Sequence, residues 1–309
     1  MTHYILFGGK GGVGKTSCAA ATALHYSKKG KKTLVVSTDP AHSLSDSFET
    51  KIGSKEKQIS ENLFAVEIDP KEAMEKVKEK IGEQPEMPAG LGPIMPGMDM
   101  SGMMGGMGDM PGMDEMAAFD KFLQYIDSDE YDYVIFDTAP TGHTLKFLSL
   151  PELMDSFVGK MLKLKLQLSN AMSMFKQLIP FSGEREKDNS LGALEEMKAR
   201  IEKGKLVLTN PNKTEFVLVM IPQEMSVFES ERARKTLEDY GIKISKIVVN
   251  QIQPSHKGCD FCTSRRDLHQ KQLGYIHKNF KKAPIVEVPL SKDEVKGRKL
   301  EEFSKQLFK

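Results

Sequence analysis

Eight residues near the start of the chain have types and a spacing that suit phosphate binding. The run Gly9-Lys10-Gly11-Gly12-Val13-Gly14-Lys15-Thr16 fits the P-loop pattern G-x-x-x-x-G-K-[ST]. Its glycines let backbone N–H groups approach phosphate oxygens closely, and a helix that starts there adds its positive end. We expect Lys15 to reach the β- and γ-phosphates and the Thr16 hydroxyl to hold Mg²⁺. The run therefore predicts a nucleotide site, which the next residue, Ser17, extends.

The same glycines also fit a dinucleotide fingerprint, Gly9-x-Gly11-x-x-Gly14. This alternative is weaker, because Gly14-Lys15-Thr16 completes the P-loop. In addition, no acid ends the second predicted strand, where a dinucleotide fold would place its ribose ligand.

Two aspartates follow predicted strands. Asp39 comes just after the apolar run Thr33–Ser37, and Asp137 directly follows Tyr133–Phe136. An acid beyond a strand end lies on the ligand side of a parallel sheet. Asp137 is therefore a Walker B candidate that would hold Mg²⁺ through water. Either acid alone could be a helix cap, but together with the P-loop they predict phosphoryl transfer.

Apolar runs alternate with helix-like stretches along most of the chain. The runs are Tyr4–Phe7, Thr33–Ser37, Leu63–Ile68, Tyr133–Phe136, Phe216–Ile221, Ile247–Val249 and Ile285–Val288. The helix-like stretches include Thr16–Ser27, Ser226–Tyr240 and Ser264–Lys281. This alternation predicts an α/β fold with a doubly wound, mostly parallel sheet that helices cover on both faces. Since the glycine loop occurs once, we expect residues 1–309 to form a single P-loop domain.

Two stretches interrupt the alternation, and we expect residues 70–130 and 145–200 to form a helical insert subdomain. Within the first, residues 87–116 hold 10 of the 19 methionines, with 8 glycines and 4 prolines. Methionine is unbranched and polarisable, so a methionine-rich surface can fit many apolar partners. Glycine and proline weaken a helix, however. Three interpretations stay open: a flexible low-complexity insertion, a surface for apolar clients, and a soft-metal site.

Composition excludes several classes of protein. Lys and Arg number 44 and Asp and Glu 43, a balance that argues against a dedicated nucleic-acid-binding protein. Three cysteines are too few for a disulfide framework and indicate a reducing compartment, the cytoplasm. The first residues lack the features of a signal peptide, and no apolar run is long enough to span a membrane.

Two cysteines form a C-x₂-C pair, Cys259 and Cys262. Two thiolates supply half of a tetrahedral zinc site, and the chain has no second such pair. A symmetric homodimer would bring two pairs together around one shared metal. The alternative is a redox dithiol. We expect it less, because the pair is not predicted to open a helix after a strand as in thioredoxin. The third cysteine, Cys18, is expected to be a buried small residue.

The second lysine of the loop, Lys10, gives the deviant Walker A form, which resembles the MinD/ParA and ArsA class of P-loop ATPases. Two further motifs, Asp39-Pro40-Ala41-His42-Ser43 and Asp137-Thr138-Ala139-Pro140-Thr141-Gly142-His143-Thr144, resemble the ArsA/GET ATPase family in order and spacing. Within it, the chain is similar to archaeal homologues of the Get-pathway ATPases, which target tail-anchored membrane proteins. The resemblance covers most of the chain.

The resemblance implies an ATPase that works as a homodimer. It implies that Lys10 contacts phosphates of the nucleotide in the partner subunit, so that two ATP molecules lie near the interface. Asp39 would lie in switch I and orient the attacking water, and Asp137 would open switch II. The resemblance also implies zinc shared between subunits at Cys259 and Cys262.

The adenine contacts follow from the same resemblance. Val249-Asn250-Gln251 matches the family's adenine-binding segment, which assigns Asn250, and Val288-Pro289-Leu290 begins its adenine loop. One departure concerns charge. Where eukaryotic members carry a nucleotide-contacting Glu, this chain has Gln223, followed by Glu224.

The expected function is ATP-driven binding of transmembrane segments of tail-anchored proteins in a methionine-rich groove, and their delivery to a receptor at a membrane. Two alternatives stay open. An arsenite-pump ATPase would use extra cysteines to sense As(III), and this chain has only Cys18 beyond the pair. A general holdase chaperone would use its nucleotide site only as a switch.

Overall fold

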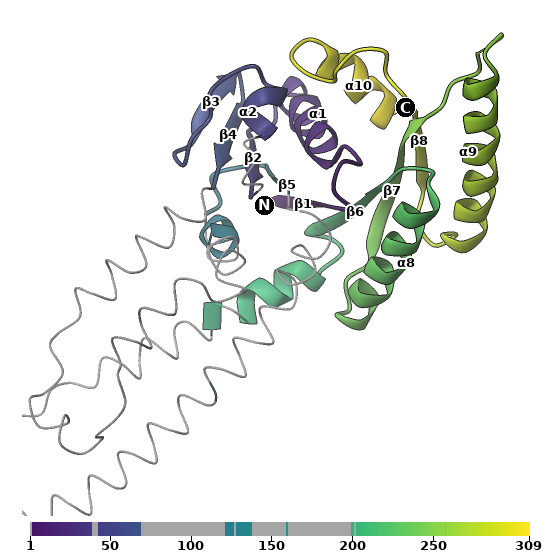
Figure 1. Cartoon of the computed structure of the whole chain (residues 1–309). Coiled ribbons are helices and arrows are strands. Elements are labelled where there is room, and N and C mark those ends of the chain that lie inside the picture. Colours follow the sequence, from purple (N-terminus) through teal and green to yellow (C-terminus); the bar gives the residue numbers. More distant parts are fainter. Residues whose placement is uncertain are drawn as a thin grey trace, which may run out of the picture.

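The computed structural model of the chain describes residues 2–38, 43–68, 121–126, 128–137, 159, 199–200, 202–256 and 258–309. Its centre is an eight-stranded sheet with the order β3-β4-β2-β5-β1-β6-β7-β8 (Figure 1). Every neighbouring pair is parallel except β3 and β4 at one edge, which are antiparallel. The predicted α/β fold with a mostly parallel sheet is therefore confirmed.

The predicted apolar runs coincide with seven of these strands. The strands are β1 (His3–Gly8), β2 (Thr33–Ser37), β3 (Lys57–Ser60), β4 (Leu63–Glu67), β5 (Tyr133–Asp137), β6 (Thr214–Met220), β7 (Ile244–Ile252) and β8 (Ile285–Pro289). The eighth strand, β3, was not predicted, because its residues are mostly exposed and polar.

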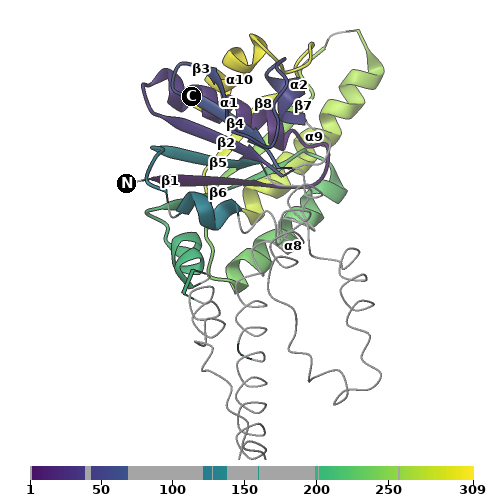
Figure 2. The ribbon, with the colours of Figure 1, turned by 90° about the vertical axis from the view of Figure 1, so that its left-hand side faces the viewer.

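Helices cover both faces of the sheet, as its buried strands require. The helices with defined bounds are α1 (Lys15–Lys28), α2 (Ser43–Ser47), α8 (Glu224–Asp239), α9 (Asp260–Asn279) and α10 (Lys299–Leu307). One face packs against α1 and α10, and the other against α8, α9 and the helical residues 121–126 (Figures 1 and 2). Alternate residues of β1 separate the two cores, since Ile5 and Phe7 face α1 while Tyr4 and Leu6 face the other side.

The first helix packs closely on the sheet because its inner face is small. Cys18, Ala19, Ala20, Ala21 and Ala23 are all fully buried there. The strands that α1 covers end at the same level of the sheet. Phe7 of β1 and Ser37 of β2 both lie opposite Asp137 of β5 in the parallel register. The carboxyl ends of three central strands therefore meet beside the glycine loop that follows β1.

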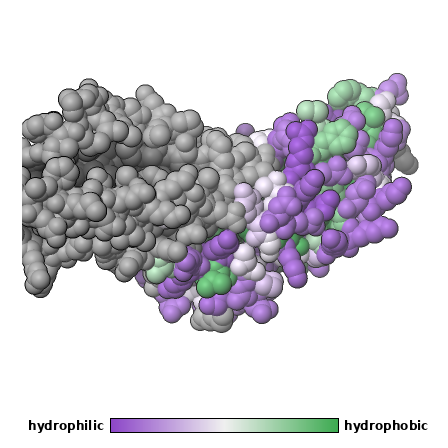
Figure 3. All heavy atoms as spheres, turned by 90° about the horizontal axis from the view of Figure 1, so that it is seen from below, coloured by the Kyte–Doolittle hydropathy of each residue, from purple (hydrophilic) through white to green (hydrophobic). Residues whose placement is uncertain are grey.

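The predicted helical insert lies mostly outside the described residues. Of its two segments, 70–130 and 145–200, the structure describes only residues 121–126, 128–130, 159 and 199–200. The methionine-rich residues 87–116 are not among them. Within the described part, no helix has the length and apolar character to cross a membrane. On the face seen in Figure 3, its apolar residues stand in small groups among hydrophilic ones.

Candidate nucleotide-binding site

The P-loop joins the end of β1 to the start of α1, as the sequence predicts. Gly14 is the N-cap residue of α1 and has a φ of 94°. A side chain here would be strained and would overlap the Asn250 amide nitrogen. At Gly9, a Cβ would overlap the carbonyl oxygen of Val219 on β6. These two positions accept only glycine, because the loop is packed against its neighbours.

The side chains predicted to bind phosphate and magnesium, Lys15 and Thr16, come directly after Gly14 in the chain. Lys15 begins α1 and is 8% exposed, and its Nζ donates to the Lys10 carbonyl oxygen at 3.1 Å. The lysine therefore folds back over the loop, where a phosphate would lie. The Thr16 hydroxyl is 3.2 Å from the Ser43 hydroxyl at the start of α2. Thr16 thus lies at the space between the P-loop and α2, while Lys15 lies over the loop itself.

Asp137 lies beside this space at the end of β5. It is fully buried and accepts a hydrogen bond of 3.2 Å from the Ser37 hydroxyl. Burial, then the Asp137 charge, raise the pKa of the neighbouring Cys18 thiol, while Lys15 opposes them. Cys18 is therefore a buried small residue whose thiol stays protonated.

Asp39 falls within residues 39–42, which lie outside the described residues. Both flanks of this segment are defined. Before it, the Thr38 amide donates to the Asp137 carbonyl oxygen at 3.1 Å, and after it Ser43 begins α2. Asp39 is therefore four residues from Ser43 and two from the end of β2, and its role stays a prediction.

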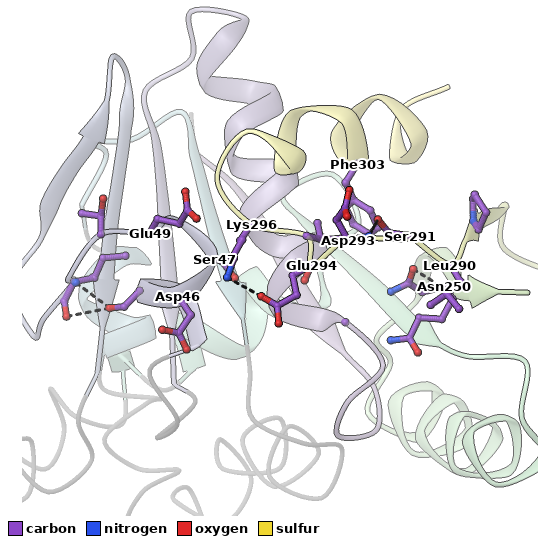
Figure 4. Close-up of a pocket in the computed structure, with 18 of the residues that line it drawn as sticks. Asp46, Ser47, Glu49, Asn250, Leu290, Ser291, Asp293, Glu294, Lys296 and Phe303 are labelled. Carbon is purple, nitrogen blue, oxygen red and sulfur yellow. Dashed lines mark hydrogen bonds and ion pairs between the residues drawn. The ribbon is translucent and has the colours of Figure 1, made fainter.

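A cavity of about 1100 Å³ opens beside the P-loop. Five residues predicted for the nucleotide line it: Gly14, Ser17, Asn250, Pro289 and Leu290. They come from three segments that are far apart in the sequence: the P-loop with the start of α1, the end of β7, and the end of β8. Figure 4 shows the cavity between residues that follow β2, including Asp46 and Glu49, and the group around Asn250 and Leu290. Its remaining walls come from the turn after α2 and from the loop before α10.

The Asn250 side chain has a fixed orientation at the end of β7. It is 5% exposed, its Nδ2 donates to the Val13 carbonyl oxygen at 2.9 Å, and its Oδ1 accepts from the Gln251 amide at 2.9 Å. The Leu290 amide donates to the Ile252 carbonyl oxygen at 2.8 Å, which holds the predicted adenine loop against β7. The base-side residues therefore form one connected wall.

Gln251 is a site residue that the sequence reasoning missed. Its Nε2 donates to the Gly12 carbonyl oxygen at 3.2 Å, and its φ of 57° is unusual for a non-glycine residue. Two adjacent amide side chains, Asn250 and Gln251, therefore bind two adjacent P-loop carbonyls. No motif marks this role, because it depends on the fold bringing β7 beside the loop.

Lys10 points toward α8. Its Nζ lies 3.1 Å from the Glu229 carboxylate, and both side chains are partly exposed. The ammonium group is thus at the surface of the subunit, within reach of a molecule that docks there. Gln223, the departure from the family pattern, is the N-cap residue of the same helix and Glu224 begins it.

One prediction about the cysteine pair was wrong. Cys259 is the N-cap residue of α9, so the pair does open a helix after strand β7. The Cys262 amide donates to the Cys259 sulfur at 3.4 Å, and this bond lowers the pKa of the Cys259 thiol. Among the described residues, no three His, Cys, Asp or Glu side chains gather as a metal site. One chain therefore offers two thiols at this position.

A P-loop between a strand and a helix, with a buried aspartate on the neighbouring strand of a mostly parallel sheet, defines a P-loop NTPase. The chain matches the anion-transporting ATPase family over residues 2–309 and belongs to this ArsA ATPase family. It is therefore an ATPase, and the predicted ArsA/GET resemblance is confirmed.

Three relatives illustrate the likeness. The chain is 37% identical to ATPase GET3B of Arabidopsis thaliana, over 95% of this chain and 75% of the relative. It is 38% identical to ATPase get3 of Schizosaccharomyces pombe, over 99% and 91%. It is 36% identical to ATPase ASNA1 homolog 1 of Paramecium tetraurelia, over 99% and 92%.

Proposed function

We propose that this protein is a homodimeric targeting ATPase that binds transmembrane segments of tail-anchored proteins and delivers them to a membrane receptor. The observation that carries the proposal is the P-loop with its adjoining cavity, which lies at the carboxyl ends of the central strands. The chain that carries this site is related to GET3 ATPases. ATP hydrolysis would drive the cycle of client binding and release.

ATP fits the two parts of the site. Its phosphates would lie in the P-loop under Lys15, and its adenine would lie in the cavity between Asn250 and the loop at Pro289 and Leu290. Each end of the Asn250 amide makes one hydrogen bond within the chain and has capacity for another. One end could accept from the adenine amino group while the other donates to a ring nitrogen.

Magnesium fits the oxygen atoms at the sheet edge. The Thr16 hydroxyl and the Asp137 carboxylate are the hard ligands that Mg²⁺ prefers, and Asp137 would act through water. When bound with ATP, the ion would neutralise charge that develops on the phosphates. Asp39 would orient the attacking water on the other side of the γ-phosphate.

Dimerisation would use two features at the subunit surface. Lys10 would exchange its ion pair with Glu229 for phosphates of the nucleotide in the partner. Cys259 and Cys262 would meet the same pair of a second copy and hold one zinc ion in tetrahedral geometry. The first turn of α9 fixes the spacing of the two thiols, which suits a structural site.

The client surface would lie in the helical insert, residues 70–130 and 145–200, with the methionine-rich residues 87–116 against the client. Methionine side chains adapt to apolar helices of different shapes, so one surface could accept many transmembrane segments. Closure of the dimer around ATP would join two inserts into one groove, and hydrolysis would open it.

The Asp39→Asn variant tests the coupling of hydrolysis to release. We expect it to bind ATP and client normally but to turn over ATP slowly, because the amide orients water poorly. Client transfer to vesicles carrying a receptor would then stall. Unchanged turnover would contradict the assigned role of Asp39. Normal transfer without turnover would contradict the proposed cycle.

A second candidate is an arsenite-pump ATPase subunit, which the family description as an anion-transporting ATPase favours. The fully buried Cys18 lies beside the P-loop, apart from the pair at α9, so these three thiols do not form one As(III) site. Stimulation of ATP turnover by As(III) would favour this candidate.

Client binding by a Lys15→Ala variant would instead favour a general holdase.

A further inference from the structure

Glu67 is a buried acid that has no role in the mechanism proposed above. It lies at the carboxyl ends of the strands, on the same side of the sheet as the nucleotide site. It ends β4, is 2% exposed, and lies opposite Ser37 of β2 in the parallel register. Ser37 in turn lies opposite Asp137 and donates to its carboxylate. Glu67, Ser37 and Asp137 thus form a row across three neighbouring strands.

Both carboxylate oxygens of Glu67 accept hydrogen bonds from Ser45 of α2. The Ser45 amide donates to Oε1 at 2.8 Å, and the Ser45 hydroxyl donates to Oε2 at 2.7 Å. The hydroxyl also accepts from the Ile52 amide at 2.9 Å, which closes the turn after α2. Bonds to a buried carboxylate are stronger than neutral ones, so this pair fixes α2 firmly to the sheet.

Both ends of α2, the helix that Glu67 holds, contact the nucleotide site. At its first residue, the Ser43 hydroxyl contacts the Thr16 hydroxyl of the P-loop at 3.2 Å. At its last residue, the Ser47 carbonyl accepts from the Gly297 amide at 2.9 Å, in the loop that lines the cavity. Figure 4 shows Ser47 and Lys296 close together beside this cavity. A shift of α2 would therefore disturb the phosphate end and the base end together.

We propose that Glu67 is a positioning residue for ATP hydrolysis, which acts by holding α2 in place. Residues 39–42 connect Thr38, whose amide is bound to Asp137, to Ser43 at the start of α2. Ser43 in turn contacts Thr16, the proposed magnesium ligand, so the position of α2 sets one side of the phosphate site. This inference rests on the proposed function only through the role of the phosphate site in ATP hydrolysis, since the Glu67–Ser45 contact is a feature of the chain alone.

Two variants test the inference, Glu67→Gln and Ser45→Ala. A carboxamide keeps the size of Glu67 but has one acceptor oxygen and so cannot serve both donors in the same way. We expect turnover of ATP to fall about tenfold or more, because small displacements of reacting groups are costly. The dissociation constant for ATP should rise by a smaller factor than turnover falls, because the wall of the cavity at Asn250 and Leu290 does not include α2. The double variant should be no slower than the slower single variant, because both remove one interaction.

Amide hydrogen exchange gives a readout that needs no nucleotide. Exchange in residues 43–52 should be faster in Glu67→Gln than in wild type, since the Ser45 amide and hydroxyl lose a charged acceptor that serves both. Glu56, which precedes β3, offers a control, because its carboxylate also accepts two hydrogen bonds but from residues outside α2, Tyr125 and Tyr131. Glu56→Gln should leave both turnover and exchange in residues 43–52 unchanged.

The Glu67–Ser45 contact, its part in hydrolysis and the proposed function are each contradicted by a different result. Unchanged exchange in residues 43–52 would overturn the contact, and unchanged turnover in folded Glu67→Gln protein would overturn its part in hydrolysis. Equal loss of turnover in Glu56→Gln would show a general loss of stability and also overturn the inference. A wild-type chain without ATP turnover would contradict the proposed function itself, which is a different result.

Discussion

At the scale of single residues, close packing decides what the nucleotide site accepts. Gly14 combines a left-handed backbone with contact to Asn250, while Asn250 and Gln251 bind the carbonyls of Val13 and Gly12. Hydrogen bonds to these carbonyls turn them away from the loop interior and leave its N–H groups for phosphate. The site is thus arranged before ATP enters.

Gly14→Ala should weaken ATP binding as well as stability. The new methyl group would displace the Asn250 amide, and the φ of 94° would add strain of about 1 kcal/mol. Gly30→Ala is the matched control, because Gly30 has a φ of 76° but open space around it. Both variants should lose thermal stability, and only Gly14→Ala should lose ATP affinity in a binding titration. Equal ATP affinity in the two variants would contradict the packing described here.

The residue types at this site were predictable, and their partners were not. The P-loop and Asp137 follow from short motifs with known spacing, and the structure places them together. Glu67, Gln251 and the Lys10–Glu229 pair depend on contacts between distant segments. Since no spacing rule encodes such contacts, one sequence does not reveal them.

At the scale of elements, burial separates the strands that were predicted from the elements that were not. The seven predicted strands are apolar runs, mostly buried in all but the edge strand β8, whereas β3 is an exposed polar edge strand and α2 has only 5 residues. The amphipathic helix α10 carried a readable signal that was missed, since Leu300, Phe303 and Leu307 share one buried face. Helix α9 was predicted from Ser264 onward, but its start at Cys259 was missed because cysteine is not a favoured N-cap residue.

The stability of α9 should depend on pH through His269. This imidazole is 3% exposed, and its Nδ1 accepts from the Gln253 amide at 3.0 Å. Burial, and then the charge of Arg265, lower its pKa below the usual 6.5, so the folded chain binds fewer protons here than the unfolded chain. Stability should therefore fall as the pH drops below about 6.5.

Denaturant unfolding at pH 7.5 and pH 5.5 measures this effect. Wild type should lose more free energy of unfolding between the two pH values than His269→Gln, which cannot take up the proton. The variant should be less stable than wild type at pH 7.5, because the fit of the buried ring is lost. An equal loss in both proteins would show that His269 does not cause the acid sensitivity.

At the scale of the whole molecule, the proposed homodimer would use features at the surface of the chain. Lys10 and the Cys259–Cys262 pair lie at the surface of the subunit, and the pair alone supplies half of a tetrahedral metal site. The helical insert, where the client surface is proposed, lies mostly outside the described residues.

Removing the cysteine pair should remove the metal and weaken the dimer. Wild type is expected to hold about one zinc ion per two chains, and the Cys259→Ser/Cys262→Ser variant none. Cys18→Ala is the control, because this buried thiol lies in α1 beside the P-loop. Elemental analysis with light scattering would give the metal content and the mass. A zinc-free wild-type dimer would contradict the shared site.

The most direct test of the proposed function is co-expression with a tail-anchored protein. The same client without its transmembrane segment is the control. The full client should copurify with a zinc-containing dimer, and the truncated client should not. The masses from light scattering and the metal content decide the result together. A client-free, zinc-free monomer from both co-expressions would contradict the account.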